Sequence, residues 1–369
     1  MSVEFPKPVL LIVTGILILA LIFLLLPSPQ IAVSTSPFVP SPFPFEVPVS
    51  KTGFLRAPEL AGISGVFNAP SDFSISAQKG KVVLVDFWTY SCINCLRTFP
   101  YLKDWHEKYA RSGLVIVGVH TPEFDFEKNP ENVQAAVLRE GLPYPVVQDN
   151  DYKTWNAYQN HYWPHHFLID ADGFIRFDHI GEGGYQETEL KIVELLKERD
   201  DRIQMNASRP NVLGTDFSRI RTPEIYFGSN FLRQPFGNEQ VLVADTPIEF
   251  SMPERPLKEN LAYLEGTWIL RPGYAELLSE TGQVALVFTA KDANLVAGAS
   301  TTVWLNVSVD GKSLGLGTAG ADAVAKKNRI FVPVKDQRLY RVVASVDYEK
   351  KELLIEAQKG FQLYTFTFG

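Results

Sequence analysis

"VVLVDFWTYSCINCLRTFP", residues 82–100, contains both cysteines of the 369-residue chain, Cys92 and Cys95. The run before them, residues 82–88, is almost entirely apolar, which is typical of a strand buried on both faces. Residues 93–111 carry apolar side chains at helical spacing. We therefore expect Cys92 to open a helix directly after a buried strand.

A cysteine in the first turn of a helix is chemically activated. Backbone N–H groups there lack partners and the helix dipole adds partial positive charge, so a thiolate is favoured over a thiol, whose ordinary pKa is about 8.5. Cys95 lies one turn later on the same face, within reach of a disulfide. The pair therefore predicts a nucleophile, Cys92, and a resolving thiol, Cys95, which displaces the mixed disulfide.

Three other interpretations of the cysteine pair stay open at this point. The two cysteines could be buried core residues. With His161 and His165 they could form a zinc site, although 65 residues separate the two pairs, against about 12–15 in a zinc finger. Cys92 could also act alone, as in a thiol peroxidase, which would leave Cys95 without a role.

Two residues outside the helix are candidates for supporting roles. Asp86 is an acidic residue within the apolar run, where burial of a carboxylate is costly. It is either a satisfied polar strand residue or a proton acceptor for Cys95. Pro164, in HYWPHHFLID, cannot donate a ladder hydrogen bond, so we expect it at a strand start or in a turn.

Strands and helices alternate from about residue 60 to residue 200, which predicts an α/β domain with a largely parallel centre. A turn at Ala171-Asp172-Gly173 predicts a terminal hairpin. The other predicted elements are a strand at 114–120, a helix at 131–141, a strand at 144–148 and a helix at 187–199.

After residue 220 strand-like runs dominate, separated by turn residues, which predicts a β-sandwich. Asp310-Gly311 lies between two of these runs and is a strong hairpin signal.

Several motifs together resemble the thioredoxin superfamily. VDFWTYSCINC, with a proline five residues beyond, matches its pattern of a buried acid, an aromatic pair and CxxC. FWTYSCINCLRTFPYL, GVHTPEF and YWPHHFLIDADG are similar to the extracytoplasmic redoxin part of the DipZ proteins, which are relatives of TlpA-type membrane-tethered thiol reductases. The resemblance covers about residues 60–200.

The resemblance implies a thioredoxin fold, with a central mixed sheet flanked by helices. It also implies a role for each of seven residues: Cys92 as nucleophile, Cys95 as resolving thiol, Asp86 as buried acid, Trp88 as part of the aromatic pair, Pro100 as a helix-kink proline, Pro164 as a cis-proline facing the disulfide, and Glu123 as an acid that approaches the cysteines.

The C-terminal part also resembles the DipZ proteins, through TPEIYFG, GTWILRPGYAEL and the final YTFTFG. This resemblance implies a galactose-binding-like jelly-roll, akin to carbohydrate-binding modules. Trp268, Trp304 and Tyr274 could stack on a sugar, although tryptophans of a sandwich more often face its core. The dipeptide between the cysteines, Ile93-Asn94, differs from the Gly-Pro of thioredoxin, so a redox potential cannot be carried over.

Residues 9–26 are 18 uncharged residues, which predicts a membrane span, with a cleaved signal peptide as the alternative. Lys7 precedes the span, so the positive-inside rule places the N-terminus in the cytoplasm and the rest outside it. A single span cannot carry electrons across the membrane as the multi-helix part of DipZ proteins does. We therefore expect a separate CcdA- or DsbD-like electron donor.

The net charge of −7 and the absence of a basic run argue against nucleic-acid binding. The sequence as a whole predicts a single-pass, extracytoplasmic thiol–disulfide oxidoreductase that acts on protein thiols, needs no cofactor or metal, and works as a reductase. A non-catalytic glycan- or cell-wall-binding protein is the alternative from another class. The predicted parts are a cytoplasmic N-terminus (1–8), the membrane span (9–26), a Pro/Ser-rich linker (27–57), the redox domain (58–205), a second linker (206–220) and the sandwich (221–369).

Overall fold

The computed structural model describes residues 51–203 and 215–369. The predicted cytoplasmic N-terminus and membrane span lie outside the described residues, as do most of the Pro/Ser-rich linker and much of the second linker. Among the residues that are described, no helix is long and apolar enough to cross a membrane.

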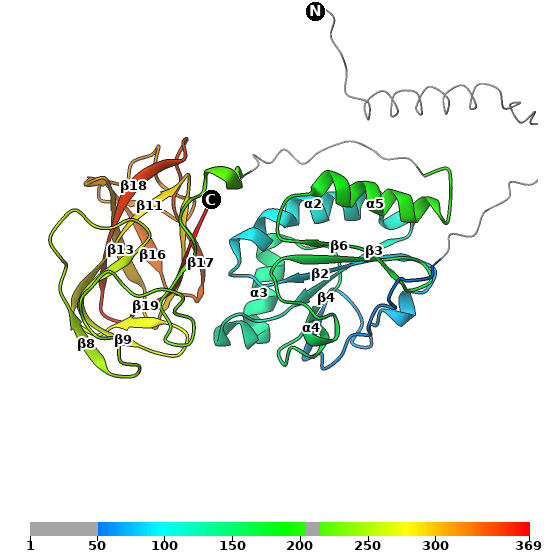
Figure 1. Ribbon diagram of the computed structural model, residues 1–369, viewed down its shortest axis with the longest axis horizontal. Coiled ribbons are helices and arrows are strands. Elements are labelled where there is room, and N and C mark those ends of the chain that lie inside the picture. The colour runs from blue at the N-terminus through cyan, green and yellow to red at the C-terminus, as the bar shows by residue number, and fades with distance from the viewer. Residues whose placement is uncertain (1–50, 204–214) are drawn as a thin grey trace, which may run out of the picture. The chain divides into compact units, whose positions relative to one another are not determined.

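The first domain is built on a six-stranded sheet with the strand order β1-β4-β3-β2-β5-β6 (Figure 1). Its strands β2, β3 and β4 run parallel, whereas β1, β5 and β6 are antiparallel to their neighbours. The predicted mixed sheet is therefore confirmed. The strands are β1 (Gly65–Phe67), β2 (Val82–Trp88), β3 (Leu114–His120), β4 (Val146–Gln148), β5 (His165–Ile169) and β6 (Ile175–Ile180).

Helices cover both faces of this sheet. Three of them, α2, α3 and α5, pack into one hydrophobic cluster, while α4 and the segment before β2 pack into another. Figure 1 shows α2 and α5 over one face of the sheet and α4 beneath the other. The helices are α2 (Ile93–Tyr109), α3 (Pro130–Glu140), α4 (Lys153–Ala157) and α5 (Tyr185–Lys197), with short 3-10 turns at Ser76–Gln78, Ala110–Ser112 and Asp125–Lys128.

Strand β2 sets the position of the site because it lies at the centre of the sheet. All seven of its residues are buried, as the apolar run predicts. Its alternate side chains enter the two clusters: Leu84 and Trp88 face α2, whereas Val85 and Phe87 face α4. Asp86 shares the face of Leu84 and Trp88, so its carboxylate points toward the helix that carries the cysteines.

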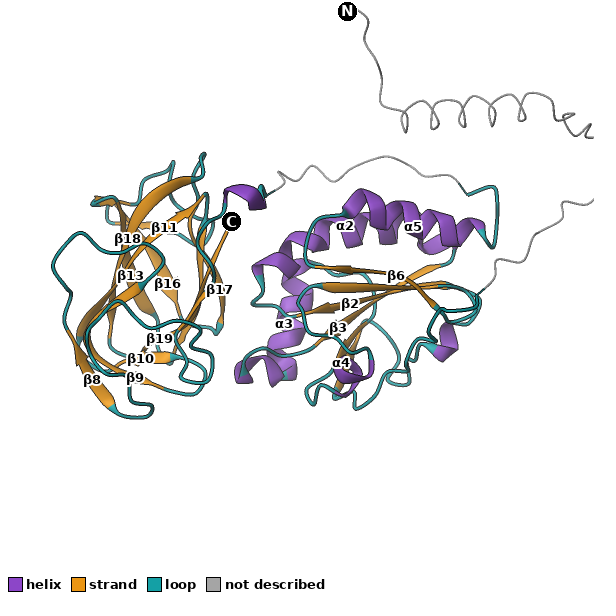
Figure 2. Cartoon of the chain, viewed as in Figure 1, coloured by secondary structure: helices purple, strands orange, loops and turns teal. Residues whose placement is uncertain are grey.

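The second domain consists of strands and loops apart from one short turn at Phe217–Arg219 (Figure 2). Its 13 strands form one continuous pairing network, in which β9 pairs with β11 along its first half and with β8 and β10 along its second half. The all-β prediction is confirmed, while the jelly-roll class stays a prediction. The strands are β7 (Ile225–Tyr226), β8 (Pro247–Phe250), β9 (Ala262–Leu270), β10 (Ala275–Leu277), β11 (Thr281–Ala290), β12 (Ala293–Ala299), β13 (Val303–Val309), β14 (Lys312–Ser313), β15 (Val324–Lys326), β16 (Arg329–Val334), β17 (Arg338–Val343), β18 (Glu349–Gln358) and β19 (Phe361–Phe368).

Two predicted turns have the expected backbone geometry. Asp310 and Gly311 have φ values of 51° and 72° and connect β13 to β14, as a type I′ hairpin requires. The predicted hairpin between β5 and β6 also forms, and Gly173 takes a φ of 91° in its turn.

Candidate active site

Cys92 caps the N-terminus of α2. Its backbone is extended, with φ −82° and ψ 113°, and its Sγ accepts a hydrogen bond from the N–H of Cys95 at 3.3 Å. This N–H is one of the amides that a helix leaves unpaired at its first turn. The sulfur therefore lies where backbone donors and the helix dipole stabilise negative charge.

The two cysteines differ in accessibility. Cys92 is partly exposed, whereas Cys95 is fully buried, and both are free thiols. Burial raises the pKa of the Cys95 thiol well above its usual range, and the neighbouring Cys92 and the charge of Asp86 raise it further. An incoming sulfur can therefore reach Cys92 first, and Cys95 must lose its proton before it can attack.

Trp163, the residue before Pro164, lies next to Cys92. The peptide bond between Trp163 and Pro164 is cis, and the Cys92 Sγ lies 3.9 Å from the carbonyl oxygen of Trp163. The indole N–H of Trp163 donates to the carbonyl of Thr121 at 3.1 Å, which holds this loop against the end of β3.

Asp86 is paired with a histidine that the sequence argument did not single out. The Asp86 carboxylate is completely buried, and its Oδ1 lies 3.2 Å from Nε2 of His166, which is also buried. His166 lies directly opposite Asp86 across β2 and β5. A cross-strand partner depends on which strands pair, so no local sequence signal identifies it.

Trp88 packs behind the cysteines and does not reach solvent. It is fully buried, with ring centroids 5.1 Å from Phe99 and 4.9 Å from His120. No hydrogen bond to its indole nitrogen is formed among the described residues. The structure therefore places Trp88 as a packing residue under α2.

The carboxylate of Glu123 accepts a hydrogen bond from the hydroxyl of Tyr226 on β7 at 2.8 Å. Burial raises the pKa of Glu123 to about 8, and the nearby carboxylates of Glu224 and Glu127 add to the shift. No hydrogen bond or ion pair joins Glu123 to either cysteine among the described residues.

Glu127, rather than Glu123, supports the residue that precedes Cys92. Its buried carboxylate accepts hydrogen bonds from Ser91, from the hydroxyl at 2.6 Å and from the N–H at 3.2 Å. It also accepts the N–H groups of Glu123 at 2.6 Å and Phe124 at 2.9 Å. Burial raises the pKa of Glu127, while these hydrogen bonds oppose the rise. The sequence argument missed this residue because it lies in a loop with no motif of its own.

Two histidines near the site have other partners. His120 is fully buried, stacks on Tyr90 and has a pKa lowered to about 3 by burial, so it supplies no positive charge to a thiolate. His165 lies 2.8 Å from Asn160 and 3.0 Å from Asp178 through its two ring nitrogens. The zinc interpretation needs His165 as a ligand, and no group of three or more candidate metal ligands is found in the described part of the chain.

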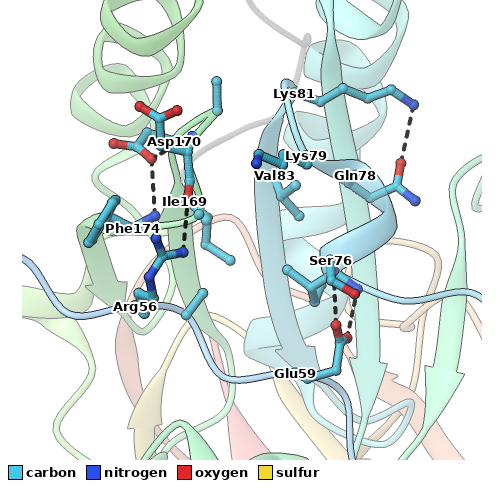
Figure 3. A pocket seen from close by; sticks show the side chains of 15 residues that line it. Arg56, Glu59, Ser76, Gln78, Lys79, Lys81, Val83, Ile169, Asp170 and Phe174 are labelled. Carbon is cyan, nitrogen blue, oxygen red and sulfur yellow. Dashed lines mark hydrogen bonds between the residues drawn. The ribbon is translucent and has the colours of Figure 1, made fainter.

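A pocket of about 500 Å³ lies at the opposite end of β2 from the cysteines (Figure 3). Its acids are already engaged: Glu59 accepts the N–H groups of Ile75 and Ser76, and Asp170 pairs with Arg176 at 3.0 Å. Among the described residues, no cysteine or histidine lines this pocket, and the two thiols lie at the other end of β2.

The three aromatic residues considered for sugar binding lie in different environments. Trp268 is fully buried in the core of the second domain, and Tyr274 is half-buried with its ring centroid 5.0 Å from that of Tyr364. Trp304 is half-buried and lines a surface pocket of about 270 Å³ with Phe331. Three cations also line this pocket: Lys326, Lys327 and Arg329.

Comparisons with known proteins match the two domains to two different families. The AhpC/TSA family matches residues 57–178, and a family described as the thioredoxin like C-terminal domain matches residues 222–369. Two parts of the chain are therefore similar to thioredoxin-like families. It is 35% identical over 322 residues to Protein DipZ of Mycobacterium bovis, a match that covers 85% of this chain and 43% of that protein. This chain therefore spans less than half the length of the DipZ relatives that it matches.

Two thiol-disulfide oxidoreductases match about a third of the chain. The chain is 26% identical to the thiol-disulfide oxidoreductase YkuV of Bacillus subtilis over 32% of this chain and 80% of that protein. It is 32% identical to the thiol-disulfide oxidoreductase ResA of Bacillus thuringiensis over 30% of this chain and 61% of that protein. Among solved structures, a thiol-disulfide isomerase from Corynebacterium glutamicum is 24% identical, with a TM-score of 0.35, over 38% of this chain and 96% of that one.

Proposed function

We propose that this protein is a thiol–disulfide oxidoreductase that exchanges disulfides with protein substrates through Cys92 and Cys95. The observation that carries the proposal is the partly exposed Cys92 Sγ at the first turn of α2, 3.3 Å from the N–H of Cys95. The similarity to the thiol-disulfide oxidoreductases YkuV and ResA over about a third of the chain supports this assignment.

In the reductive direction the reaction has two steps. The Cys92 thiolate attacks a substrate disulfide, forms a mixed disulfide and releases the first substrate thiolate. Cys95 then loses its proton and attacks Cys92, which forms the Cys92–Cys95 disulfide and releases the second substrate thiolate. Asp86 accepts that proton in this proposal, which is supported by its position on the face of β2 that packs against α2 and by its effect in raising the pKa of Cys95. The two cysteines carry both electrons, and the exchange needs no metal or organic cofactor.

The setting of this activity is also part of the proposal. The apolar residues 9–26 would anchor the protein in the membrane with both domains on the extracytoplasmic side. The similarity to DipZ favours a reductase that a CcdA- or DsbD-like membrane donor reduces again. The half-buried Trp304 and Phe331, with three cations around them, leave glycan binding as a second candidate activity of the C-terminal domain.

Trapping of the mixed disulfide tests the proposal. Replacing the resolving thiol, Cys95→Ser, should leave Cys92 able to attack but unable to release its partner. We therefore expect covalent, dithiothreitol-sensitive complexes with extracytoplasmic proteins from Cys95→Ser and none from the matched variant Cys92→Ser. The same complexes from both variants, or from neither, would contradict the proposal.

Two further measurements separate the rival functions. A thiol peroxidase would consume peroxide with Cys92 alone, so the Cys95→Ser variant would retain that activity. The reduction potential of the cysteine pair tests the direction, because a value near about −270 mV favours a reductase and one near about −120 mV favours an oxidase.

A further inference from the structure

Three titratable side chains form a row across three neighbouring strands. Asp86 on β2 lies directly opposite His166 on β5, and His166 lies directly opposite His179 on β6. Residues directly opposite one another in a sheet share a face, so all three side chains lie on the face that α2 and α5 cover. Asp86 and His166 are 3.2 Å apart, and the ring centroids of His166 and His179 are 6.4 Å apart.

The row leads from the core of the domain toward its surface. Asp86 is 0% exposed and His166 is 2% exposed, whereas His179 on the edge strand is half-buried. The inner end of the row shares the face of β2 that packs against α2, the helix that carries Cys95, and Cys95 is also 0% exposed. A proton that leaves Cys95 therefore starts in the core, and the row of proton-accepting groups extends from the central strand to the half-buried edge strand β6.

The polar atoms of the row have few fixed partners. Both carboxylate oxygens of Asp86, both ring nitrogens of His166 and the Nε2 of His179 are buried and make no hydrogen bond of regular geometry among the described residues. Buried polar atoms without hydrogen bonds cost folding free energy, unless they bond to one another or to a bridging water. A neutral imidazole can accept a proton on one nitrogen and release one from the other, so such atoms suit proton transfer.

We propose that His166 and His179 relay the proton of Cys95 from Asp86 to solvent when the mixed disulfide is resolved. The inference rests on the proposed thiol–disulfide exchange. The Cys95 proton passes to the Asp86 carboxylate, and the sulfur's electron pair forms the bond to Cys92. The bond between Cys92 and the substrate breaks, and its electron pair leaves with the substrate thiolate. Asp86 then passes its proton to Nε2 of His166. His166 releases a proton from its other ring nitrogen to His179, and His179 releases one to solvent.

Other titratable groups near the row do not offer the same route. They are Cys92 at the start of α2, Tyr144 before β4, His165 on β5, Asp178 on β6, Glu182 before α5 and Glu187 in the first turn of α5. Burial raises the pKa of Tyr144 well above its usual range, so it cannot accept a proton. His165 and Asp178 pair with each other on the opposite face of the sheet. Burial lowers the pKa of His179, and the neighbouring His166 lowers it further, so His179 releases a proton readily.

A two-phase assay separates the steps in the reduced full-length protein. Excess 5,5′-dithiobis(2-nitrobenzoate) releases one coloured thiolate when Cys92 attacks and a second when Cys95 resolves the mixed disulfide. We expect His166→Gln to leave the first phase unchanged and to slow the second about tenfold or more near neutral pH. The two proteins should converge at alkaline pH, where hydroxide removes the Cys95 proton directly.

Two further variants distinguish a relay from a structural role. His165→Gln, at the neighbouring buried position on the opposite face, should keep the second phase and its pH profile. His179→Ala, nearer the surface, should slow the second phase, and added imidazole should restore its rate. This variant keeps the test valid where His166→Gln folds poorly.

The relay is refuted where both His166→Gln and His179→Ala keep the normal second phase, or where they slow both phases equally at every pH. Failure of the unmodified protein to release any coloured thiolate would instead refute the proposed exchange itself, and the relay with it.

Discussion

At the scale of single residues, His120 shows how burial sets the charge of the site. It is fully buried at the end of β3, beneath Tyr90 and beside Trp88, and its pKa falls to about 3 against 6.5 for an ordinary histidine. The folded protein therefore keeps His120 neutral, while the unfolded chain takes up a proton below about pH 6.5. Stability due to this site is fully present above pH 6.5 and is lost as the pH falls toward 3.

This difference predicts the effect of His120→Gln. The variant removes a group that binds a proton only in the unfolded chain, so its free energy of unfolding should depend less steeply on pH between 6.5 and 3. The reduction should approach about 1.4 kcal/mol per pH unit within that window. Urea denaturation at a series of pH values measures it, and His161→Gln, at an exposed histidine, serves as the control. Equal slopes in the parent protein and His120→Gln would contradict the prediction.

At the scale of elements, the sequence predicts those helices and strands whose signals lie within their own residues. The apolar run of residues 82–88 becomes β2 with its predicted bounds, because a strand buried on both faces needs apolar side chains on both. The predicted helix 131–141 becomes α3, because Pro130 suits its first turn and Gly141 takes the left-handed conformation that ends it.

Contacts between distant elements could not be predicted in this way. The pairing of Asp86 with His166 follows from β5 lying beside β2, which no local pattern specifies. The contact of Glu127 with Ser91 joins a loop to the start of α2, 36 residues apart. Family resemblance brought Glu123 to attention, but its carboxylate is turned toward Tyr226 by a hydrogen bond between distant segments.

The packing of β3 against β2 gives a prediction at the same scale. A Cβ added at Gly118 would lie 2.7 Å from Nε1 of Trp88, whose ring is fully buried, so the ring or the strand would have to shift. Gly118→Ala should therefore lower the free energy of unfolding by about 1–3 kcal/mol. Chemical denaturation measures the loss, and Gly315→Ala, at a glycine with open space around it, should change stability little. Equal stability of the two variants would show that Trp88 can shift.

At the scale of the whole molecule, the two domains obtain their stability in different ways. The first buries its apolar side chains in two clusters, one on each face of the six-stranded sheet. The second buries one large cluster and one small cluster among its strands. The candidate reactive thiols lie in the first domain. In the proposed function, the electrons for these thiols come from a membrane donor, and the predicted membrane span outside the two domains brings the thiols to it.

The predicted membrane span at residues 9–26 gives a testable expectation. Eighteen residues of helix extend about 27 Å, close to the thickness of the hydrocarbon core of a bilayer. Deleting residues 9–26 should release the protein from the membrane fraction, and its reduced form should still exchange with a small disulfide. In intact cells, however, the oxidised fraction of Cys92–Cys95 should rise severalfold, because a membrane donor no longer meets it.

Thiol labelling after acid quenching measures that oxidised fraction, and replacing residues 9–26 with an unrelated single-span segment provides the matched control. Restoration by the unrelated segment means that the anchor acts by holding the dithiol at the membrane surface, where collision with the donor is frequent. An unchanged oxidised fraction in the deleted protein would mean that reduction does not depend on membrane attachment, and the proposed membrane donor would then be wrong.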